Sequence, residues 1–120
     1  MSYVDGFVVP VPKKKVAAYK ALSRKCGKVW REHGALDYKE CIADDVSWGK
    51  RTSFPRSVKQ KDTETVFFSY IVYKSRKHRD QVMAKVMKDT RLKGMEDPKN
   101  HPFDAKRMIW GGFKVVVDAK

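Results

Sequence analysis

The segment from residue 65 to residue 73, which reads TVFFSYIVY, is predominantly apolar at both its odd and its even positions. Successive side chains of a strand point to opposite faces, so a run without polar alternation predicts a central strand that is covered on both sides. Such a strand needs a neighbouring strand on each edge and a layer over each face. The rest of the chain must therefore supply further strands and the elements that cover them.

Two further segments are typical of strands, and the residues between them predict a helix. Residues 3–11 are mostly β-branched or aromatic, and residues 36–43 alternate with a period of two, so both predict strands. From residue 13 to residue 33 apolar side chains recur every three or four positions, which indicates an amphipathic helix with Gly34 as its C-terminal cap. The predicted inward side chains are Val16, Tyr19, Leu22, Cys26, Val29 and Trp30.

A second helix and a last strand follow the central run. Ser75 is expected to cap the N-terminus of a helix that extends through residue 88. Gly111 and Gly112 predict a bulge or bend before a strand over residues 113–117. The expected inward stripe of the second helix is Val82, Met83, Val86 and Met87.

The resulting order β-α-β-β-α-β predicts a ferredoxin-like α+β fold, an antiparallel sheet with both helices on one face. A chain of 120 residues has the size of one domain, and we expect that domain to span residues 1–120. Residues 44–64 form a long excursion, and an excursion of this length usually has a functional or a packing role. Because the strands are apolar on both sides, we expect a second copy to cover the helix-free face in a two-fold homodimer.

Charge and cysteine content indicate the surroundings in which the chain works. It carries 27 lysines and arginines against 14 acidic residues, a formal net charge of +13, and such a surplus attracts polyanions. No apolar run approaches the roughly 20 residues that cross a bilayer, and no basic leader precedes an apolar stretch at the N-terminus. Cys26 and Cys41 are expected to be free thiols. We therefore expect a cytoplasmic protein that does not enter membranes.

Five segments distributed over nearly the whole chain resemble one protein family. They read YVDGFVVPVPKKK, GKVWREHGAL, TSFPRSVK, IVYKSRKHRDQV and PFDAKRMIWGGF. In these segments the chain is similar to the YbaA-like family of uncharacterised bacterial proteins, domain of unknown function 1428. The resemblance implies a dimeric α+β barrel, in which two ferredoxin-like sheets face each other, and it implies no particular activity.

Polar and amphipathic side chains stand at alternating positions of the predicted strands, where we expect them to converge in an apolar cavity beside the first helix. A carboxylate buried in such a cavity has a raised pKa and can act as a general base. We take Asp5, Glu40 and His33 as catalytic candidates of a cofactor-free enzyme, and the same cavity would serve a binding protein. The alternative is that the strand residues are satisfied side chains at the edge and rim of the sheet, and that His33 interacts with the C-terminal carbonyls of its helix. The predicted small-molecule pocket comprises Tyr3, Asp5, Trp30, Tyr38 and Tyr70.

The alternative function is the binding of nucleic acid or another polyanion through the first helix and the 44–64 excursion. RNA-recognition modules share the β-α-β-β-α-β order, but their third strand carries a basic residue followed by glycine and aromatic residues. The run TVFFSYIVY has neither glycine nor a basic residue, which favours non-specific contact with phosphates, or a charge that serves only solubility. The candidate residues are Lys13, Lys14, Lys20, Arg24, Lys28, Arg51 and Arg56.

No motif for metal binding or nucleophilic catalysis is present. His33, His78 and His101 stand in separate predicted elements, without the spacing that brings two metal ligands together. The chain also lacks a glycine-rich phosphate loop and a nucleophile elbow. We therefore expect neither a metal ion nor a cofactor.

Overall fold

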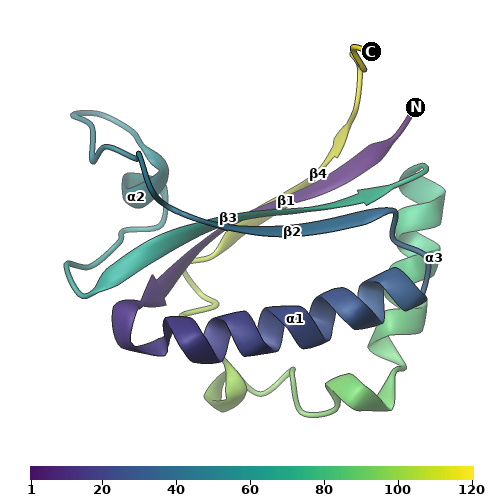
Figure 1. Cartoon of the computed structure of the whole chain (residues 1–120), viewed down its shortest axis with the longest axis horizontal. Coiled ribbons are helices and arrows are strands. Elements are labelled where there is room, and N and C mark those ends of the chain that lie inside the picture. Colours follow the sequence, from purple (N-terminus) through teal and green to yellow (C-terminus); the bar gives the residue numbers. More distant parts are fainter.

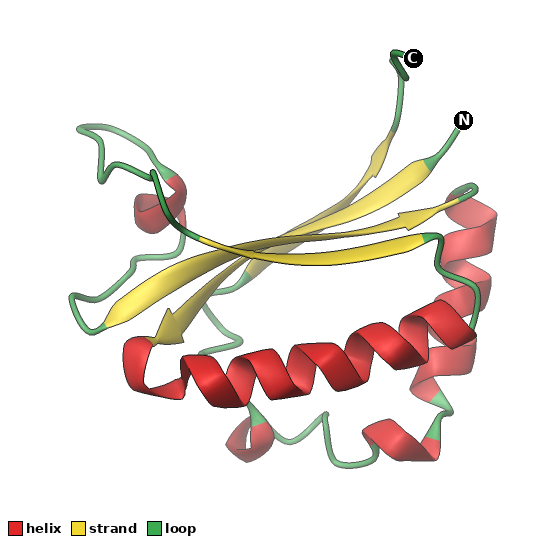
Figure 2. Cartoon of the chain, viewed as in Figure 1, coloured by secondary structure: helices red, strands yellow, loops and turns green.

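The computed structural model describes residues 1–120 and has the predicted ferredoxin-like order (Figures 1 and 2). Single turns of 3-10 helix precede the first α-helix and interrupt the long segment before the last strand. The elements are β1 (Tyr3–Pro12), α1 (Val16–Glu32), β2 (Asp37–Ile42), α2 (Phe54–Ser57), β3 (Glu64–Tyr73), α3 (Arg76–Met87) and β4 (Ile109–Lys114), and the 3-10 turns are Lys13–Lys15, Thr90–Leu92 and Pro98–Asn100.

The four strands form one antiparallel sheet in the order β2-β3-β1-β4. β3 lies between β2 and β1, so the apolar run is a central strand, as its composition predicts. In the register of the sheet, Tyr73 is paired with Tyr3 on β1, and Ile71 is paired with Tyr38 on β2. This register places the side chains of Tyr3, Ile71 and Tyr38 on one face of the sheet, because paired residues of antiparallel strands point to the same side.

Helices α1 and α3 both cover this face (Figure 1). α1 approaches the sheet closely because its inward side includes the small buried residues Ser23 and Gly27. A Cβ atom on Gly27 would lie 2.9 Å from Cδ1 of Tyr38, so the helix and the tyrosine ring occupy adjacent space. The core that both helices share with the sheet comprises Tyr3, Val29, Ala35, Ile71, Tyr73, Val82 and Val86.

The two predicted helix caps are confirmed by local hydrogen bonding and backbone geometry, although α1 begins at Val16, after a 3-10 turn over Lys13–Lys15. Ser75 caps α3, since its hydroxyl accepts a hydrogen bond from the backbone N–H of His78 at 3.0 Å. Gly34 follows the end of α1 with φ +118°, a conformation that favours glycine. The predicted inward stripe of α3 is wrong at Met87, which is 69 % exposed. Val82 and Val86 define the buried side of the helix, and Met87 is turned about 100° away from Val86.

The last strand differs from the prediction. β4 pairs with β1 from Ile109 to Lys114 without an extra residue on either strand, so neither the bulge at Gly111 and Gly112 nor a strand over residues 113–117 is present. Gly112 has a different role, because the side chain of Tyr3 lies directly over it. A Cβ atom on Gly112 would lie 2.7 Å from Cε2 of Tyr3. Only glycine avoids this steric clash, because it has no Cβ atom.

The excursion between β2 and β3, residues 43–63, folds over one end of the helix-free face and contains α2 (Figure 1). Val58 from this excursion packs against Val8 and Val66 of the sheet, and all three are buried. The ring of Phe54 meets that of Phe68 edge-on at 5.8 Å between centroids. The excursion therefore covers part of the face and has the packing role that its length suggests.

The remainder of the helix-free face is open. Phe68 and Ile109 are each 45 % exposed and Phe113 is 64 % exposed, although all three side chains project from the sheet itself. An exposed apolar surface of this kind on a sheet face usually marks an interaction site.

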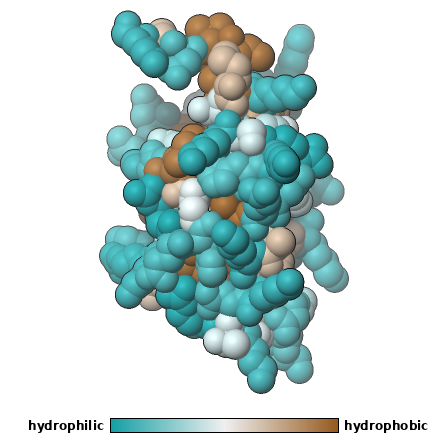
Figure 3. Space-filling model, turned by 90° about the vertical axis from the view of Figure 1, so that its right-hand side faces the viewer, coloured by the Kyte–Doolittle hydropathy of each residue, from teal (hydrophilic) through white to brown (hydrophobic).

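The side of the molecule on which α3 lies is mostly hydrophilic, with a group of apolar side chains at its top, where the chain ends lie (Figure 3). Val116 and Val117, which follow β4, are each 78 % exposed. No helix combines the length and the apolar character that a membrane crossing requires.

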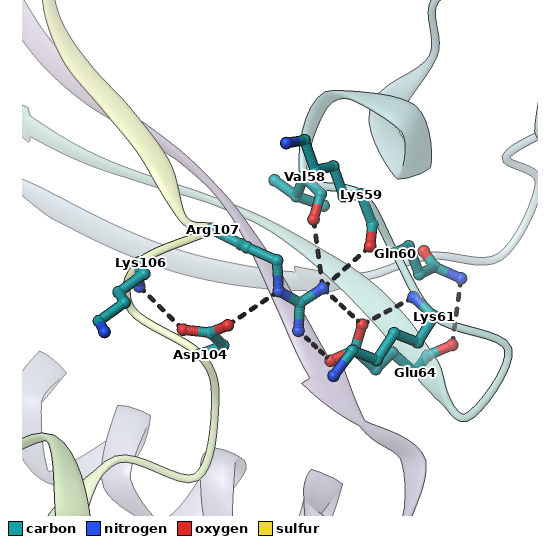
Figure 4. A network of polar contacts seen from close by, with 8 residues as sticks. All are labelled: Val58, Lys59, Gln60, Lys61, Glu64, Asp104, Lys106 and Arg107. Atoms are coloured by element: carbon teal, nitrogen blue, oxygen red, sulfur yellow. Dashed lines mark hydrogen bonds and ion pairs between the residues drawn. The ribbon is translucent and has the colours of Figure 1, made fainter.

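Arg107 joins the excursion to the segment before β4 (Figure 4). Its guanidinium donates to both carboxylate oxygens of Glu64, at 2.8 and 2.6 Å, and to the carbonyl oxygen of Lys59 at 3.0 Å. It also donates to Asp104 at 2.9 Å and to the carbonyl oxygen of Val58 at 3.3 Å. The side chain therefore satisfies acceptors from three parts of the chain at once.

Candidate functional site

An inner cavity of about 160 Å³ lies between α1 and the sheet, and 11 of its 15 lining residues are hydrophobic. β1 contributes Phe7 and β3 contributes Ile71, and Phe103 and Met108 come from the segment before β4. Ligand sites in proteins are commonly apolar hollows with a few polar groups, and this cavity has that character. Its polar lining residues are Ser23, Lys39, Glu40 and Ser69.

A larger open groove of about 590 Å³ runs between α1 and β2. Ser23, Tyr38 and Glu40 line both the groove and the inner cavity. These three residues therefore form the boundary between a wide, polar entrance and a narrow, apolar interior.

Glu40 is the only carboxylate on this boundary, and hydroxyl groups hold it in place. The Tyr19 hydroxyl donates to its two oxygens at 3.0 and 3.2 Å, and the Ser23 hydroxyl donates to Oε2 at 3.0 Å. Tyr19 and Ser23 are one turn apart on α1, so the helix aims both hydroxyls at the same carboxylate of β2.

The surroundings of Glu40 raise its pKa. Burial disfavours the charged carboxylate and is the largest cause, while the hydroxyls of Ser23, Tyr19, Ser69 and Tyr38 oppose it by hydrogen bonding. Burial, followed by the negative charge of Glu40, also raises the pKa of Tyr19 and Tyr38 above the usual range. The arrangement can accept a proton from a bound molecule or hold a donor group of that molecule.

Of the predicted pocket residues, Trp30 and Tyr38 lie in the inner cavity with Glu40. The rings of Trp30 and Tyr38 approach each other with centroids 6.3 Å apart. The structure therefore brings Trp30, Tyr38 and Glu40 to one cavity.

Tyr3 and Asp5 belong to a second polar cluster around Arg79, away from Glu40. The Arg79 guanidinium lies over the Tyr3 ring at 5.2 Å and donates to the Tyr3 hydroxyl at 3.3 Å, and its Nε lies 3.9 Å from Oδ1 of Asp5. Burial raises the pKa of Asp5, and the positive charge of Arg79 opposes this rise. The predicted convergence of Asp5 with Glu40 is wrong, because the two carboxylates occupy separate clusters under the sheet.

Tyr70 and His33 also lie outside the cavity. Tyr70 follows Ser69 and precedes Ile71, which both line the cavity, so strand alternation places the Tyr70 side chain on the opposite face of the sheet. Nε2 of His33 lies 2.7 Å from Oδ2 of Asp89, an ion pair beyond the end of α1 when the imidazole is protonated. Neither residue is positioned to act with Glu40.

Sequence reasoning missed the hydroxyl groups around Glu40. Tyr19 belongs to the predicted apolar stripe of the first helix, and Ser23 and Ser69 are not among the predicted site residues. The signal was present in the sequence: serine four residues after tyrosine on a helix, and one serine within an otherwise apolar strand, are polar positions that need a buried partner.

The predicted polyanion residues do not form one surface. Lys20, Arg24 and Lys28 lie along the groove on α1, and Lys13 and Lys14 are exposed in the 3-10 turn before it. Helix α1 and the excursion that carries the remaining two residues lie on opposite sides of the sheet (Figure 1). The remaining two are Arg51, which is exposed, and Arg56, which donates to the carbonyl oxygens of Trp48 and Gly49.

Metal-ligating side chains do not gather at this site or elsewhere: the structure contains no group of three or more histidine, cysteine, aspartate or glutamate residues suited to a metal ion. Cys26, which lines the inner cavity, has a pKa raised to about 11 by burial and by the nearby charge of Glu40. Its thiol is therefore a weak nucleophile at neutral pH.

Comparison with solved structures identifies the same fold. A protein described as "Putative antibiotic biosynthesis monooxygenase from Nitrosomonas europaea" superposes with a TM-score of 0.63 at 17 % identity, covering 96 % of this chain and 90 % of its own. A dimeric ferredoxin-like protein from an uncultured marine organism superposes with a TM-score of 0.57 at 12 % identity, covering 99 % and 100 %. At these identities the likeness concerns the fold.

Comparison of sequences identifies the family. The chain is 47 % identical over 118 residues to the uncharacterized protein YbaA of Escherichia coli strain K12 and, equally, to that of Shigella flexneri, which is 98 % of this chain and 99 % of each relative. The model of a family described as protein of unknown function (DUF1428) matches residues 2–105. The chain is therefore a member of the DUF1428 family, and it is similar to the YbaA proteins over nearly its whole length.

Proposed function

We propose that the chain binds a small organic molecule in the cavity between α1 and the sheet, and that Glu40 is the group that accepts a proton or a hydrogen bond from it. The observation that supports this function is the position of Glu40, a half-buried carboxylate between an apolar interior and an open groove. The pocket serves a cofactor-free enzyme or a binding protein, and both use the same ligand site.

The cost of burying a carboxylate favours a functional role for Glu40. A carboxylate removed from water destabilises the fold unless it is compensated, and here Tyr19 and Ser23 supply the compensation from a neighbouring helix. An apolar residue at position 40 would make this arrangement unnecessary. Carboxylates with a pKa raised by burial in a hollow are typical of catalytic and binding sites.

A thermal-shift screen of a broad metabolite set tests the proposal. Wild type, Glu40→Gln and Glu96→Gln are compared, because Glu96 is exposed and lies outside both the cavity and the groove. A ligand at a hundred times its Kd stabilises a protein by about 2.7 kcal/mol, so it should raise the Tm of wild type and Glu96→Gln by several degrees. Glu40→Gln should lose most of this rise. A screen without stabilising ligands, or an equal rise in Glu40→Gln, would contradict the proposed role.

We also propose that the protein is a cytoplasmic homodimer, paired through the helix-free face of the sheet. The exposed side chains of Phe68, Ile109 and Phe113 support this pairing, since soluble proteins seldom leave such a surface open. The description of one structural neighbour as a dimeric ferredoxin-like protein also supports it. Two-fold pairing is the commonest symmetry of soluble oligomers.

Sedimentation velocity at micromolar concentration tests the dimer. Wild type should sediment as a dimer, and Phe113→Glu should shift it toward a monomer because the charge would be buried against the partner. Met87→Glu is the matched control, since Met87 is equally exposed but lies on α3 on the other side of the sheet. A wild type that sediments as a monomer would exclude the pairing.

A further inference from the structure

One side of α1 presents a row of positive charges to the open groove. Lys20, Arg24 and Lys28 are one helical turn apart and line the groove together with Arg31. Arg31 donates to the carbonyl oxygens of Ala35 and Leu36. The other three side chains are exposed and form no ion pair.

The two acidic residues of the groove do not neutralise this row. Asp37 pairs with Lys39 at 2.5 Å, and Glu40 is held by the hydroxyls of Tyr19 and Ser23. The entrance therefore keeps an excess of positive charge beside α1, within reach of any molecule that passes toward the inner cavity.

The inner cavity has the size and lining of a site for one aromatic ring. A cavity of about 150 Å³ in a protein core accommodates benzene, and this one measures about 160 Å³. Five of its lining residues are aromatic, and offset or edge-on contacts between aromatic rings stabilise such a complex. The five are Phe7, Tyr19, Trp30, Tyr38 and Phe103.

On the basis of the proposed ligand site, we propose that the ligand is a single-ring aromatic acid. Its ring occupies the inner cavity beside Glu40, and its carboxylate or phosphate group lies in the groove against Lys20, Arg24 and Lys28. The negative charge of Glu40 at the boundary repels the acid group from the interior, so the two ends of the ligand have one favourable orientation.

A long polyanion fits this surface less well. The basic row covers only about two turns of one helix, and the groove that it borders also contains Glu40, whose charge repels a continuous line of phosphates. The basic residues of the excursion lie across the sheet from it (Figure 1). A ligand with one acid group and one apolar end matches both the row and the cavity behind it.

Isothermal titration with small probes tests the proposal. The probes are benzoate, 3-phenylpropionate and phenyl phosphate, their neutral counterparts benzamide and 3-phenylpropionamide, and acetate as an acid without a ring. Wild type should bind at least one aromatic acid about tenfold more tightly than its amide, because a charge-assisted contact is lost in the amide. Acetate should not bind measurably. Carboxylate and phosphate probes distinguish the two kinds of acid group.

Two charge variants locate the acid group. Arg24→Gln combined with Lys28→Gln should weaken binding of the aromatic acid about tenfold and leave the amide unchanged. Lys14→Gln combined with Lys85→Gln is the matched control, since it removes the same charge from exposed positions outside the groove, and it should bind like wild type. Circular dichroism verifies that both double variants fold.

The possible results separate this inference from the proposed function. Equal affinity for acids and amides, with loss of both in Glu40→Gln, would overturn the proposal that the ligand is an aromatic acid. The proposed ligand site at Glu40 would still hold. Absence of binding by every probe, together with an empty metabolite screen, would overturn both. A third result is that no aromatic acid binds, whereas a generic 20-nucleotide RNA binds to wild type and not to the Arg24→Gln, Lys28→Gln double variant. This result would overturn the aromatic-acid proposal and would indicate that the basic row binds a polyanion.

Discussion

Replacement of Arg107 by alanine removes the guanidinium that joins the excursion to the segment before β4 (Figure 4). Glu64, its principal partner, has a side chain only 4 % exposed, and that of Arg107 is 17 % exposed. Loss of one partner from a buried ion pair costs about 3–5 kcal/mol, because the other charge stays buried without compensation. Arg107 retains some contact with solvent, so we expect a loss of about 3 kcal/mol in the free energy of unfolding.

Urea denaturation of a double-mutant cycle measures this value. The cycle comprises wild type, Arg107→Ala, Glu64→Ala and the double variant at one protein concentration, and the coupling energy should be about 2 kcal/mol. Arg51→Ala, at an exposed position without an ion pair, should change stability by less than about 0.5 kcal/mol. A coupling energy below about 0.5 kcal/mol would refute the reasoning, since it would make the contacts of Arg107 independent of Glu64.

The same interaction predicts a pH dependence. Hydrogen bonds from Arg107 hold the pKa of Glu64 below its ordinary value of 4.5, and they lower the pKa of Asp104 in the same direction. A carboxylate whose pKa is lower in the folded state stabilises the fold above its ordinary pKa and loses this contribution as the pH falls through the folded value. The stability difference between wild type and Arg107→Ala should therefore be constant near pH 7 and shrink below pH 4.5.

Three further substitutions test contacts between elements, each by urea denaturation. Gly112→Ala should destabilise the protein by about 2 kcal/mol, because the new Cβ would displace the buried ring of Tyr3; an unchanged midpoint would contradict this contact. Gly27→Ala should displace Tyr38 and therefore weaken ligand binding. Its effect on stability should be smaller, because alanine favours a helix over glycine by up to about 1 kcal/mol. Ser75→Ala should cost about 1 kcal/mol through loss of the α3 cap, whereas Ser75→Asp should retain it.

Local patterns were sufficient for most of the secondary structure. The apolar run on β3, the period of α1 and the cap at Ser75 each depend on side chains within a few residues, and the β-α-β-β-α-β order follows from them. The last strand was the exception. Its bounds depend on pairing with β1 and on the space that Tyr3 occupies over Gly112, neither of which is visible in the glycine pair itself.

The candidate site shows the same division between local pattern and packing. Glu40, Tyr38 and Trp30 could be proposed from alternation along a strand and the period of a helix, because both patterns are local. The separation of Asp5 from Glu40, and the position of Tyr70 on the far face, follow from the register between strands. A shift of one residue in register exchanges the two faces of a strand, so composition alone does not specify which side chains meet.

The hydroxyl groups around Glu40 could be identified only from the tertiary structure, for a related reason. Tyr19 and Glu40 are 21 residues apart in the sequence. They meet in space because the small residues Ser23 and Gly27 let α1 pack tightly on the sheet. The amino-acid sequence thus specified the elements, their order and the family, all of which arise from local periodicity and residue identity. The composition of the cavity arises from how a helix and a sheet pack against each other, and that packing is a property of the whole fold.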